Sequence, residues 1–549
     1  MKWWQKMIAY ELYPKSFNDT TNSGTGDLQG IIDKLDYLKA LNIGAIWLTP
    51  VCRSPMVDNG YDIADYCDID PSYGTMNDMK TLMAEAKKRG IRIVIDLVFN
   101  HTSEQNPWFL ESASSRDNDK SDWYIWRDAR EDGTPPTNWR GIFGGSAWTW
   151  NDTRQQYYLH TFAKQQPDLN WANPEVRQAL YDAANFWIDL GAGGFRIDAI
   201  TYIKKPDVFK DGTPDAPDGM VGIHDMIANT EGILDYLHEF KRAVRDGHDI
   251  FTVGEANGVS AEELPDWVGD NGVFDMLFEF SHINVEFKSV ENWMTPDDWT
   301  LPDLKRALTQ SQKNTKDNGW YPIFFENHDR PRAINHFYKE GANRLLAGKA
   351  IGLILYTLRG TPFLYQGEEL GMVNVAWDDI ADYNDISSIG QYKQAIETGY
   401  SHEEAMAAVH RFSRDSARTP MQWDTTVNAG FTTGQPWLPV NDDYETYNVE
   451  SELKDPDSML NWFIKLGQIR QEYDILIKGD YQELWPDDEA IYAYTRQYDD
   501  HQATILVNFS GETLDYDPSI ITEANCIISN VNNSTKGMLQ PYEAVFYLD

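Results

Sequence analysis

Cysteine and positive charge are both scarce in this sequence. Only Cys52, Cys67 and Cys526 occur in 549 residues, and none of them has C-x-x-C spacing. So few cysteines argue against a disulfide framework and favour a reducing compartment. Lysine and arginine total 47 against 86 acidic residues, a formal net charge of -39. A chain this acidic is unsuited to binding nucleic acid or an anionic membrane surface.

Long apolar runs are also missing. Nowhere do the roughly 18 consecutive apolar residues of a membrane span occur, and the first residues show no apolar signal-peptide core. We therefore expect a cytoplasmic protein, with a monomer favoured. There is no Walker-type glycine-rich loop and no H-E-x-x-H, since the run that begins at His402 lacks the second histidine. We expect no cofactor.

Short apolar segments recur along the chain, and helical patterns separate them. Their apolar character is typical of parallel strands buried on both faces. Eight such repeats predict an α/β protein built on a (β/α)8 TIM barrel. The expected strands are Met7–Leu12, Ala45–Leu48, Ile93–Val98, Phe195–Ile200, Phe251–Val253, Met276–Phe280, Ile323–Phe325 and Pro362–Tyr365.

Two excursions interrupt the repeats, and an all-β pattern follows them. We assign residues 1–103 and 174–477 to the barrel, with an insertion near 372–425. Residues 104–173, rich in Trp, Asn, Gly and Pro, form an inserted loop-rich subdomain after the third strand. Residues 478–549 alternate short strands with turns, which predicts a C-terminal β-sandwich domain.

The segment Gly194–Ile200 places two charges inside a predicted buried strand. Arg196 and Asp198 are two residues apart, so both side chains point to the same face. Buried charges are costly unless they are paired or used in chemistry. Taken alone, the segment is explained by a structural ion pair.

Other strand ends supply more polar groups. Asp96 to His101 follow the third strand, Glu255 follows the fifth, and Glu326 to Asp329 follow the seventh. Catalytic groups of TIM barrels come from these carboxyl ends. A carboxylate kept ionised by an arginine, with a second carboxyl acting as an acid, is the arrangement of retaining glycosidases.

The motifs, taken together, resemble the α-amylase family of glycoside hydrolases (family 13), and within it the oligo-1,6-glucosidase and α-glucosidase group. They occur in the family's order and cover nearly the whole chain. The matching segments are Asp96–His101, Gln166–Asn170, Gly194–Ile200, Val253–Ala256, Asn327–Asp329, Thr361–Gly371 and Arg418–Asp424.

The resemblance implies a role for each of twelve residues. Asp198 would be the nucleophile, Glu255 the acid/base and Asp329 the transition-state stabiliser. Arg418, together with Asp58, would close the pocket behind one glucose, so that the enzyme removes single units from non-reducing ends of small oligosaccharides. The other implied substrate-binding residues are Tyr61, His101, Phe143, Phe162, Gln166, Arg196 and His328.

The loop from Asp19 to Asp27 departs from the family's pattern. In relatives this loop carries acidic residues that hold calcium, but here Thr21 and Ser23 stand at two ligand positions. Losing an anionic ligand weakens a hard-cation site, so we expect no metal in it.

The residue after the nucleophile bears on which bond is cleaved. In this group it is often Val in enzymes that prefer α-1,6 bonds, and smaller or polar in those that prefer α-1,4 bonds or accept both. This chain has Ala199, which leads us to expect an α-glucosidase that accepts α-1,4 as well as α-1,6 bonds.

Three other functions compete with this one. A sucrose isomerase shares the scaffold but carries an R-L-D-R-D stretch, and nothing equivalent surrounds Arg330–Arg332. A trehalose-6-phosphate hydrolase is compatible with the same motifs. A non-catalytic, transporter-associated relative would lack the three carboxylates and carry a membrane span, so both features count against it.

Overall fold

The computed structural model describes residues 1–549 except 217, 261, 270, 288–291, 318 and 522–523. The chain folds as two compact units. The first unit contains Met1–Ile46, Glu85–Ile91 and Phe280–Asp549. The second unit contains Trp47–Ala84 and Arg92–Glu279.

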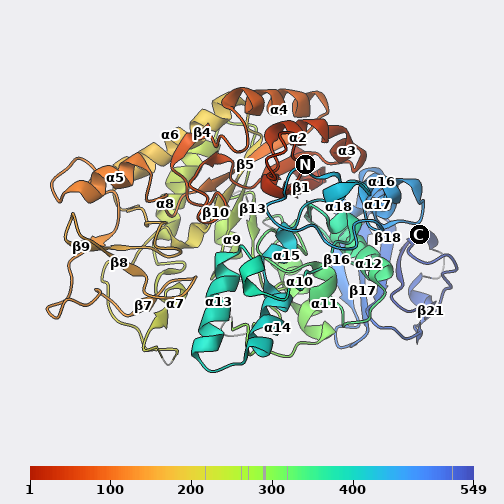
Figure 1. Cartoon of the computed structure of the whole chain (residues 1–549). Helices are drawn as coiled ribbons and strands as arrows, with labels where there is room; N and C mark the ends of the chain where they lie inside the picture. The colour runs from red at the N-terminus through yellow and green to blue at the C-terminus, as the bar shows by residue number, and fades with distance from the viewer. Residues whose placement is uncertain (217, 261, 270, 288–291, 318, 522–523) are drawn as a thin grey trace. The chain divides into compact units, whose positions relative to one another are not determined.

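Eight parallel strands form the nearly closed barrel of a TIM fold (Figure 1), which confirms the predicted fold class. Their order in the sheet is β13-β12-β10-β5-β2-β1-β15-β14. Nearly all of their residues are buried, as expected of strands covered on both faces. The strands are β1 Ala9–Leu12, β2 Ala45–Leu48, β5 Arg92–Val98, β10 Gly194–Asp198, β12 Phe251–Glu255, β13 Met276–Phe278, β14 Pro322–Ile323 and β15 Thr361–Tyr365.

Strand β10 ends two residues earlier than its apolar pattern predicts. Ala199 adopts a left-handed conformation with φ of 46°, and a 3-10 turn follows at Ile200–Tyr202. A left-handed residue cannot continue a strand, so the chain turns sharply right after Asp198. The turn leaves the Asp198 side chain at the carboxyl end of its strand.

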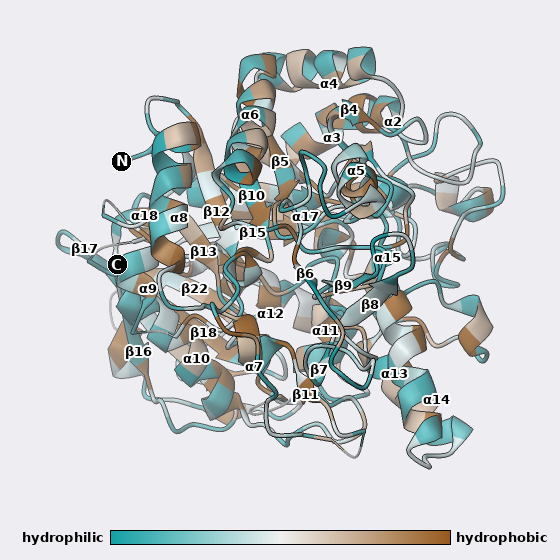
Figure 2. Ribbon diagram, turned by 90° about the vertical axis from the view of Figure 1, so that its left-hand side faces the viewer, coloured by the Kyte–Doolittle hydropathy of each residue, from teal (hydrophilic) through white to brown (hydrophobic). Residues whose placement is uncertain are grey.

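The helices that follow the strands begin and end at recognisable signals. Helix α6 starts with Asn173 as N-cap and Pro174 in its first turn, and it ends at Gly191, whose φ is 114°. In Figure 2, teal and brown residues alternate along α4 and α6, the pattern of helices with one buried face. Up to residue 357 the helices are α1 Trp3–Lys6, α2 Leu28–Asp33, α3 Leu35–Ala40, α4 Met76–Lys88, α5 Pro107–Ser114, α6 Pro174–Leu190, α7 His224–Ile227, α8 Ile233–Phe240, α9 Leu264–Trp267, α10 Leu301–Asn314, α11 Ala333–Phe337 and α12 Arg344–Thr357.

No helix in the described part of the chain combines the length and apolar character that a membrane span requires.

Short strands and one helix make up the segment between β5 and α6. A three-stranded sheet has the order β6-β9-β8, and β7 pairs with β11 further along the chain. Trp139 and Trp148 are buried there in an apolar cluster that also contains Ala199 and Tyr202. The strands are β6 Trp126–Arg127, β7 Trp139–Arg140, β8 Trp148–Asn151, β9 Gln156–Leu159 and β11 Val221–Gly222, while β3 Cys52–Arg53 and β4 Asp65–Ile69 form a separate hairpin.

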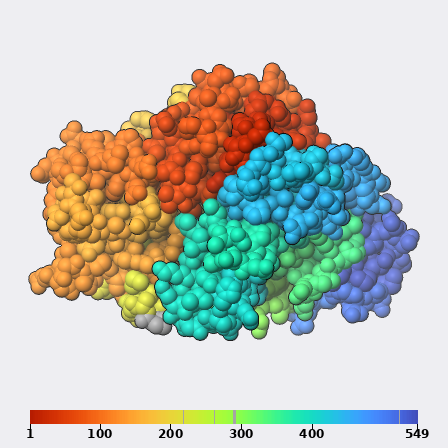
Figure 3. Space-filling model, viewed as in Figure 1, coloured from red at the N-terminus to blue at the C-terminus, as the bar shows by residue number. Residues whose placement is uncertain are grey.

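The excursion after β15 contains a helical hairpin. Helices α13 (Ile386–Glu397) and α14 (His402–Phe412) pack together, and α15 (Asp415–Arg418) follows them. The hairpin residues lie at the molecular surface in Figure 3, where they are teal. The predicted boundaries of this insertion and of the other parts of the chain remain predictions.

An antiparallel sheet forms the C-terminal domain, as predicted. Its order is β16-β17-β18-β22-β20, drawn in blue in Figure 1. Ile491, Leu506 and Val545 belong to the apolar cluster of this domain. The elements that precede and build it are α16 Val449–Lys454, α17 Met459–Glu472, α18 Ile475–Lys478, β16 Asp480–Leu484, β17 Ile491–Tyr498, β18 His501–Asn508, β19 Leu514–Asp515, β20 Asn525–Ser529, β21 Met538–Leu539 and β22 Ala544–Leu548.

Arg496 on β17 connects the C-terminal sheet to two helix ends. Its guanidinium is fully buried and donates to the carbonyl oxygens of Thr357, Leu476 and Gly479. These oxygens lie at the carboxyl ends of α12 and α18, where partial negative charge accumulates. Arg496 therefore acts as a shared C-terminal cap, which accounts for a buried cation without a carboxylate.

We predict that Arg496→Gln lowers the free energy of unfolding by about 3 kcal/mol, because buried carbonyl oxygens lose a charged donor. Thermal or urea unfolding measures the change. Arg306→Gln is the matched control, since that side chain is exposed and, among the described residues, forms an ion pair with Asp303 alone, on the same helix. Equal stability of the two variants would contradict the capping role.

Candidate active site

One buried guanidinium organises the carboxylates at the ends of β5, β10 and β12. Arg196 donates through Nη1 to Asp198 Oδ1 at 2.7 Å and to both oxygens of Asp96 at 3.0 Å. Its Nη2 donates to Glu255 Oε2 at 2.5 Å. The strand register explains this meeting, because Arg196 lies beside Asp96 on one neighbouring strand and Val253 on the other. Three carboxylates therefore share a single cation.

Burial controls the ionisation of the Asp198 carboxyl. Desolvation raises the pKa of Asp198 well above its ordinary value, and Glu255 and Asp96 raise it further, against the lowering effect of Arg196. From the sequence we expected Arg196 to depress this pKa. Arg196 does lower it, but burial and the two neighbouring carboxyls outweigh that effect. With three carboxyls around one cation, the cluster holds a proton at a higher pH than an exposed aspartate would.

Asp96 connects the carboxylate cluster to side chains outside it. It also accepts hydrogen bonds from Trp47 Nε1 at 3.1 Å and from the Tyr61 hydroxyl at 3.0 Å. Burial raises its pKa to about 6, although Arg196 and these donors oppose the rise. The sequence showed Asp96 at a strand end without giving it a role. Its donors come from residues 35 and 49 positions away, which a local pattern does not reveal.

Gln166 joins the predicted substrate-binding residues of the second unit. Its Nε2 donates to Asp58 Oδ2 at 3.2 Å and to the Tyr61 carbonyl oxygen at 3.3 Å. His101 Nε2 lies 2.9 Å from that same carbonyl oxygen, and its Nδ1 accepts from Asn100. These bonds assign the Nε2–H tautomer, and burial lowers the pKa of His101, so the ring is neutral.

Two phenylalanines extend this group. The ring of Phe162 lies 5.1 Å from that of His101 and 5.7 Å from that of Phe143. Phe162 also contacts Tyr202 edge-on, at 6.0 Å. The structure thus brings together all the predicted site residues of the second unit in a connected set around Arg196 and Gln166.

The first unit holds the other three predicted residues. Asp329 Oδ1 accepts from Arg418 Nη2 at 2.6 Å, and its Oδ2 lies 3.3 Å from His328 Nε2. His328 Nδ1 lies 2.6 Å from Glu11 Oε1, so the strand β1 carboxylate orients the ring. The Asp329 side chain is 34% exposed, whereas His328 and Arg418 are buried. Its carboxylate is thus accessible while its partners are fixed.

Arg414 and Asp385 complete this second set, and sequence reasoning missed both. Arg414 donates to Asp329 Oδ1 at 3.1 Å and to Asp385 Oδ1 at 2.8 Å. Burial alone would raise the pKa of Asp385, but Arg414 and Arg418 lower it to about 2. Asp385 is a permanent anion that balances the two cations beside Asp329. The spacing of four residues between Arg414 and Arg418 was the signal available in the sequence, because it places both side chains on one face of a helix.

The Asp19–Asp27 loop is held by hydrogen bonds. Asp19 accepts from the Thr21 and Gly24 amides and from the Thr432 hydroxyl, at 2.6 to 2.9 Å. Asp27 accepts from Thr20 and caps α2. Within the described residues, no group of three or more His, Cys, Asp or Glu is placed to hold a metal ion.

Comparison with known proteins identifies the family. The chain matches the alpha amylase catalytic domain over residues 11–479. It is 41% identical to an oligo-1,6-glucosidase of Parageobacillus thermoglucosidasius, over 99% of this chain and 98% of that one. It is also 41% identical to a trehalose-6-phosphate hydrolase of Bacillus subtilis, with the same two coverages. The isomaltulose synthase SmuA from Protaminobacter rubrum superimposes with a TM-score of 0.95 at 38% identity, covering 100% of this chain and 99% of that one.

The chain belongs to the α-amylase family. It is therefore a glycoside hydrolase of that family, and the predicted resemblance is confirmed. Its similarity is spread almost evenly over relatives that bear three different activity names. Family membership accordingly leaves the substrate to be argued separately.

A buried ammonium group supports the binding residues of this α-amylase-family chain. Lys205 Nζ lies 2.8 Å from Asn100 Oδ1 and 2.8 Å from Asp168 Oδ2, and it also donates to the Tyr202 carbonyl oxygen. Amide, carboxylate and carbonyl oxygens thus surround one cation. Because Asn100 precedes and bonds His101, Lys205 indirectly positions that ring.

We predict that Lys205→Met lowers the free energy of unfolding by about 3–5 kcal/mol, because it leaves Asp168 buried without a cation. Catalytic efficiency should fall as well, since the Asn100 side chain loses its support. Thermal unfolding and steady-state kinetics measure the two effects. Lys204→Met is the matched control: its side chain forms no ion pair with any described residue. Identical melting temperatures for the two variants would refute the assignment.

Proposed function

We propose that this protein is an exo-acting retaining α-glucosidase that releases single glucose units from the non-reducing ends of short isomalto- or malto-oligosaccharides. The observation that carries the proposal is the sharing of one guanidinium, that of Arg196, by the carboxyls of Asp198 and Glu255. Such proximity leaves no space between them for the water of an inverting mechanism, and it favours double displacement.

In this proposal Asp198 is the nucleophile and Glu255 the acid/base. Asp198 attacks the anomeric carbon while Glu255 gives its proton to the leaving oxygen, forming a covalent glucosyl-Asp198. Glu255 then takes a proton from water, and the hydroxide oxygen displaces Asp198. The raised pKa of Asp198 fits a site that holds one proton before substrate enters. The first step requires that this proton lie on Glu255.

Asp329 is proposed as the third catalytic carboxylate, which stabilises the positive charge that develops on the sugar. The two arginines and His328 around it support this role, because they fix the position of its carboxylate. All three proposed carboxylates follow carboxyl ends of barrel strands, where such folds place their chemistry. The exo action that the resemblance implies belongs to the same proposal.

The activities named for similar proteins indicate which other substrates have to be tested. A trehalose-6-phosphate hydrolase and an isomaltulose synthase resemble this chain as closely as an oligo-1,6-glucosidase does. A panel of maltose, isomaltose, panose, sucrose, trehalose 6-phosphate and dextran separates these activities. The proposal expects glucose from the first three. Glucose 6-phosphate as the main product, or isomaltulose from sucrose, would replace it with the corresponding alternative.

We predict that Asp198→Asn lowers kcat on the best substrate of the panel by on the order of a thousandfold or more, since the amide is a poor nucleophile. A fluorinated glucosyl fluoride that stalls deglycosylation should add one glucosyl unit to the Asp198 peptide of the wild type, detected by mass spectrometry. Asp182→Asn, on the exposed side of α6, is the control for a lost carboxylate. Full hydrolysis by Asp198→Asn would overturn the assignment.

Ala199 is the proposed determinant of linkage preference. Its amide donates to Glu255 Oε2 at 3.1 Å, so this residue touches the acid/base as well as following the nucleophile. Its positive φ is a conformation that β-branched residues tolerate poorly. A small side chain at this position is compatible with the left-handed turn. In the proposal it also leaves space beside the leaving group.

We predict that Ala199→Val shifts the ratio of maltose to isomaltose efficiency by about tenfold toward isomaltose, as added methyl groups narrow the leaving-group side. The same variant should melt at a lower temperature because of the left-handed φ. Ala199→Gly is the control: it relieves the backbone strain and adds no bulk. An unchanged efficiency ratio in Ala199→Val would remove Ala199 from linkage selection.

A further inference from the structure

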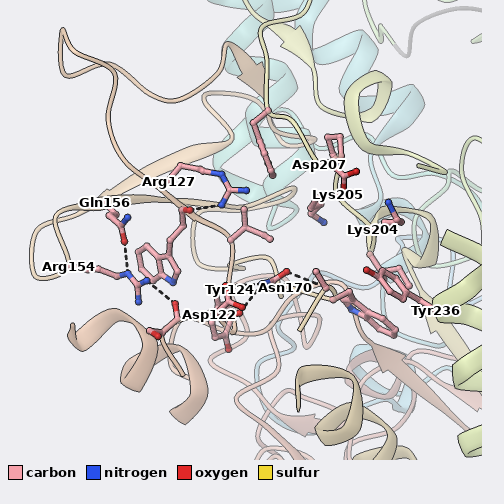
Figure 4. Close-up of a pocket in the computed structure, with 18 residues that line it drawn as sticks. Asp122, Tyr124, Arg127, Arg154, Gln156, Asn170, Lys204, Lys205, Asp207 and Tyr236 are labelled. Atoms are coloured by element: carbon pink, nitrogen blue, oxygen red, sulfur yellow. Dashed lines mark hydrogen bonds between the residues drawn. The ribbon is translucent and has the colours of Figure 1, made fainter. Parts of the chain in front are cut away.

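The second unit contains a cavity of about 470 Å³ away from the carboxylate cluster. One part of its wall comes from residues 121–122, 124–127, 154, 156 and 170–172, and another part comes from residues 203–207 and 209 (Figure 4). None of the proposed catalytic residues lines it. Its volume falls in the range of small-molecule binding sites.

The charge of this cavity is opposite to that of the protein. Its lining includes four cations, Arg127, Arg154, Lys204 and Lys205. Only two carboxylates, Asp122 and Asp207, accompany them. The chain as a whole has 47 basic and 86 acidic residues, so the excess of cations in this lining is opposite to the balance of the whole chain. Such a cavity attracts anions from solution.

Two of the four cations are occupied by internal contacts. Arg154 donates to the carbonyl oxygens of Ser112, Ser115 and Ser121, and it caps that loop. Lys205 fills the oxygen cage described above. These two side chains form part of the wall and make its electrostatic potential more positive. Their N–H groups, however, already donate to oxygen atoms of the protein.

The other two cations remain available. Arg127 donates through Nη1 to the Trp126 carbonyl oxygen at 2.7 Å, and its guanidinium lies over the Phe209 ring, 4.2 Å from the centroid. Neither Arg127 nor Lys204 forms an ion pair within the described part of the chain. Burial lowers the pKa of Arg127, and the nearby Asp122 carboxylate opposes that shift. The Phe209 ring packs against the guanidinium plane, and the other N–H groups of Arg127 form no hydrogen bond with any described residue.

Groups suited to hydroxyls lie close to these cations. The carboxylate of Asp207 and the phenol of Tyr236 line the same cavity (Figure 4). Both, together with Lys204, also line an adjoining cavity of about 490 Å³, to which Glu231 and Asp235 add two further carboxylates. A ligand with a charged end and a hydroxylated body matches this distribution.

We propose that this cavity is an accessory binding site for a phosphate group, free or carried by a sugar. Arg127 supplies a planar donor fork and Lys204 a mobile point charge, the two kinds of donor that phosphates use. Asp207 and Tyr236 are placed to bind sugar hydroxyls when a sugar is attached. The site lies outside the hydrolytic machinery and would let a sugar phosphate bind without being cleaved.

Isothermal titration calorimetry on the full chain tests the proposal with glucose 6-phosphate, inorganic phosphate and glucose as probes. We expect both phosphates to bind the wild type, and glucose 6-phosphate more tightly if the sugar contributes. Arg127→Gln and Lys204→Gln should each raise the Kd of the phosphates about tenfold. Binding of glucose should be the same in all variants. Equal Kd values for the two phosphates identify free phosphate as the sufficient ligand.

Lys210→Gln, an exposed lysine of the same loop, is the matched control and should leave every Kd unchanged. Arg127→Lys keeps the charge and loses the fork, so an intermediate Kd is expected. Lys204→Gln removes a side chain with no ion pair and keeps the test valid if Arg127→Gln fails to fold. Failure of both phosphates to bind the wild type would overturn the site. Equal weakening by Lys210→Gln, or unchanged Kd values in both Arg127→Gln and Lys204→Gln, would overturn it too.

Discussion

The Arg196 guanidinium, buried among three carboxylates, is the interaction on which the second unit's candidate site depends. A buried arginine is tolerable only with anionic partners, and three buried carboxylates are tolerable only with a cation and a bound proton. Asp96, Asp198 and Glu255 therefore cannot be understood one at a time. This mutual dependence supports the proposed function, because double displacement requires one ionised carboxylate beside one protonated carboxyl group.

Adjacent parallel strands create this interaction. β5, β10 and β12 are neighbours in the sheet, and their register sets Arg196 level with Asp96 on β5 and with Val253 on β12, two residues before Glu255 ends that strand. The left-handed turn at Ala199 then returns the chain amide toward Glu255. The backbone of these three strands and of the Ala199 turn thus places the charged groups within hydrogen-bonding distance of one another.

Four buried cations of this acidic protein each serve a specific set of oxygen atoms. Arg196 serves the carboxylates, Lys205 an oxygen cage, Arg418 the Asp329 carboxylate, and Arg496 the ends of two helices. All four are largely or fully buried, each with oxygen partners from distant segments. The cavity lined by Arg127 and Lys204 differs from these sites, because neither of these two side chains forms an ion pair with a described residue.

The sequence by itself determined the strands, the barrel and the residues at its carboxyl ends, because apolar periodicity and strand-end position are local properties. It also indicated Arg196 with Asp198, since spacing by two fixes a shared strand face. Only the tertiary structure decided that Glu11 orients His328, 317 residues away, or that Asp385 balances Arg414. It likewise decided that burial, and not Arg196 alone, governs the Asp198 pKa. Such outcomes depend on which distant side chains come into contact and on how strongly burial desolvates them. A local sequence pattern contains neither kind of information.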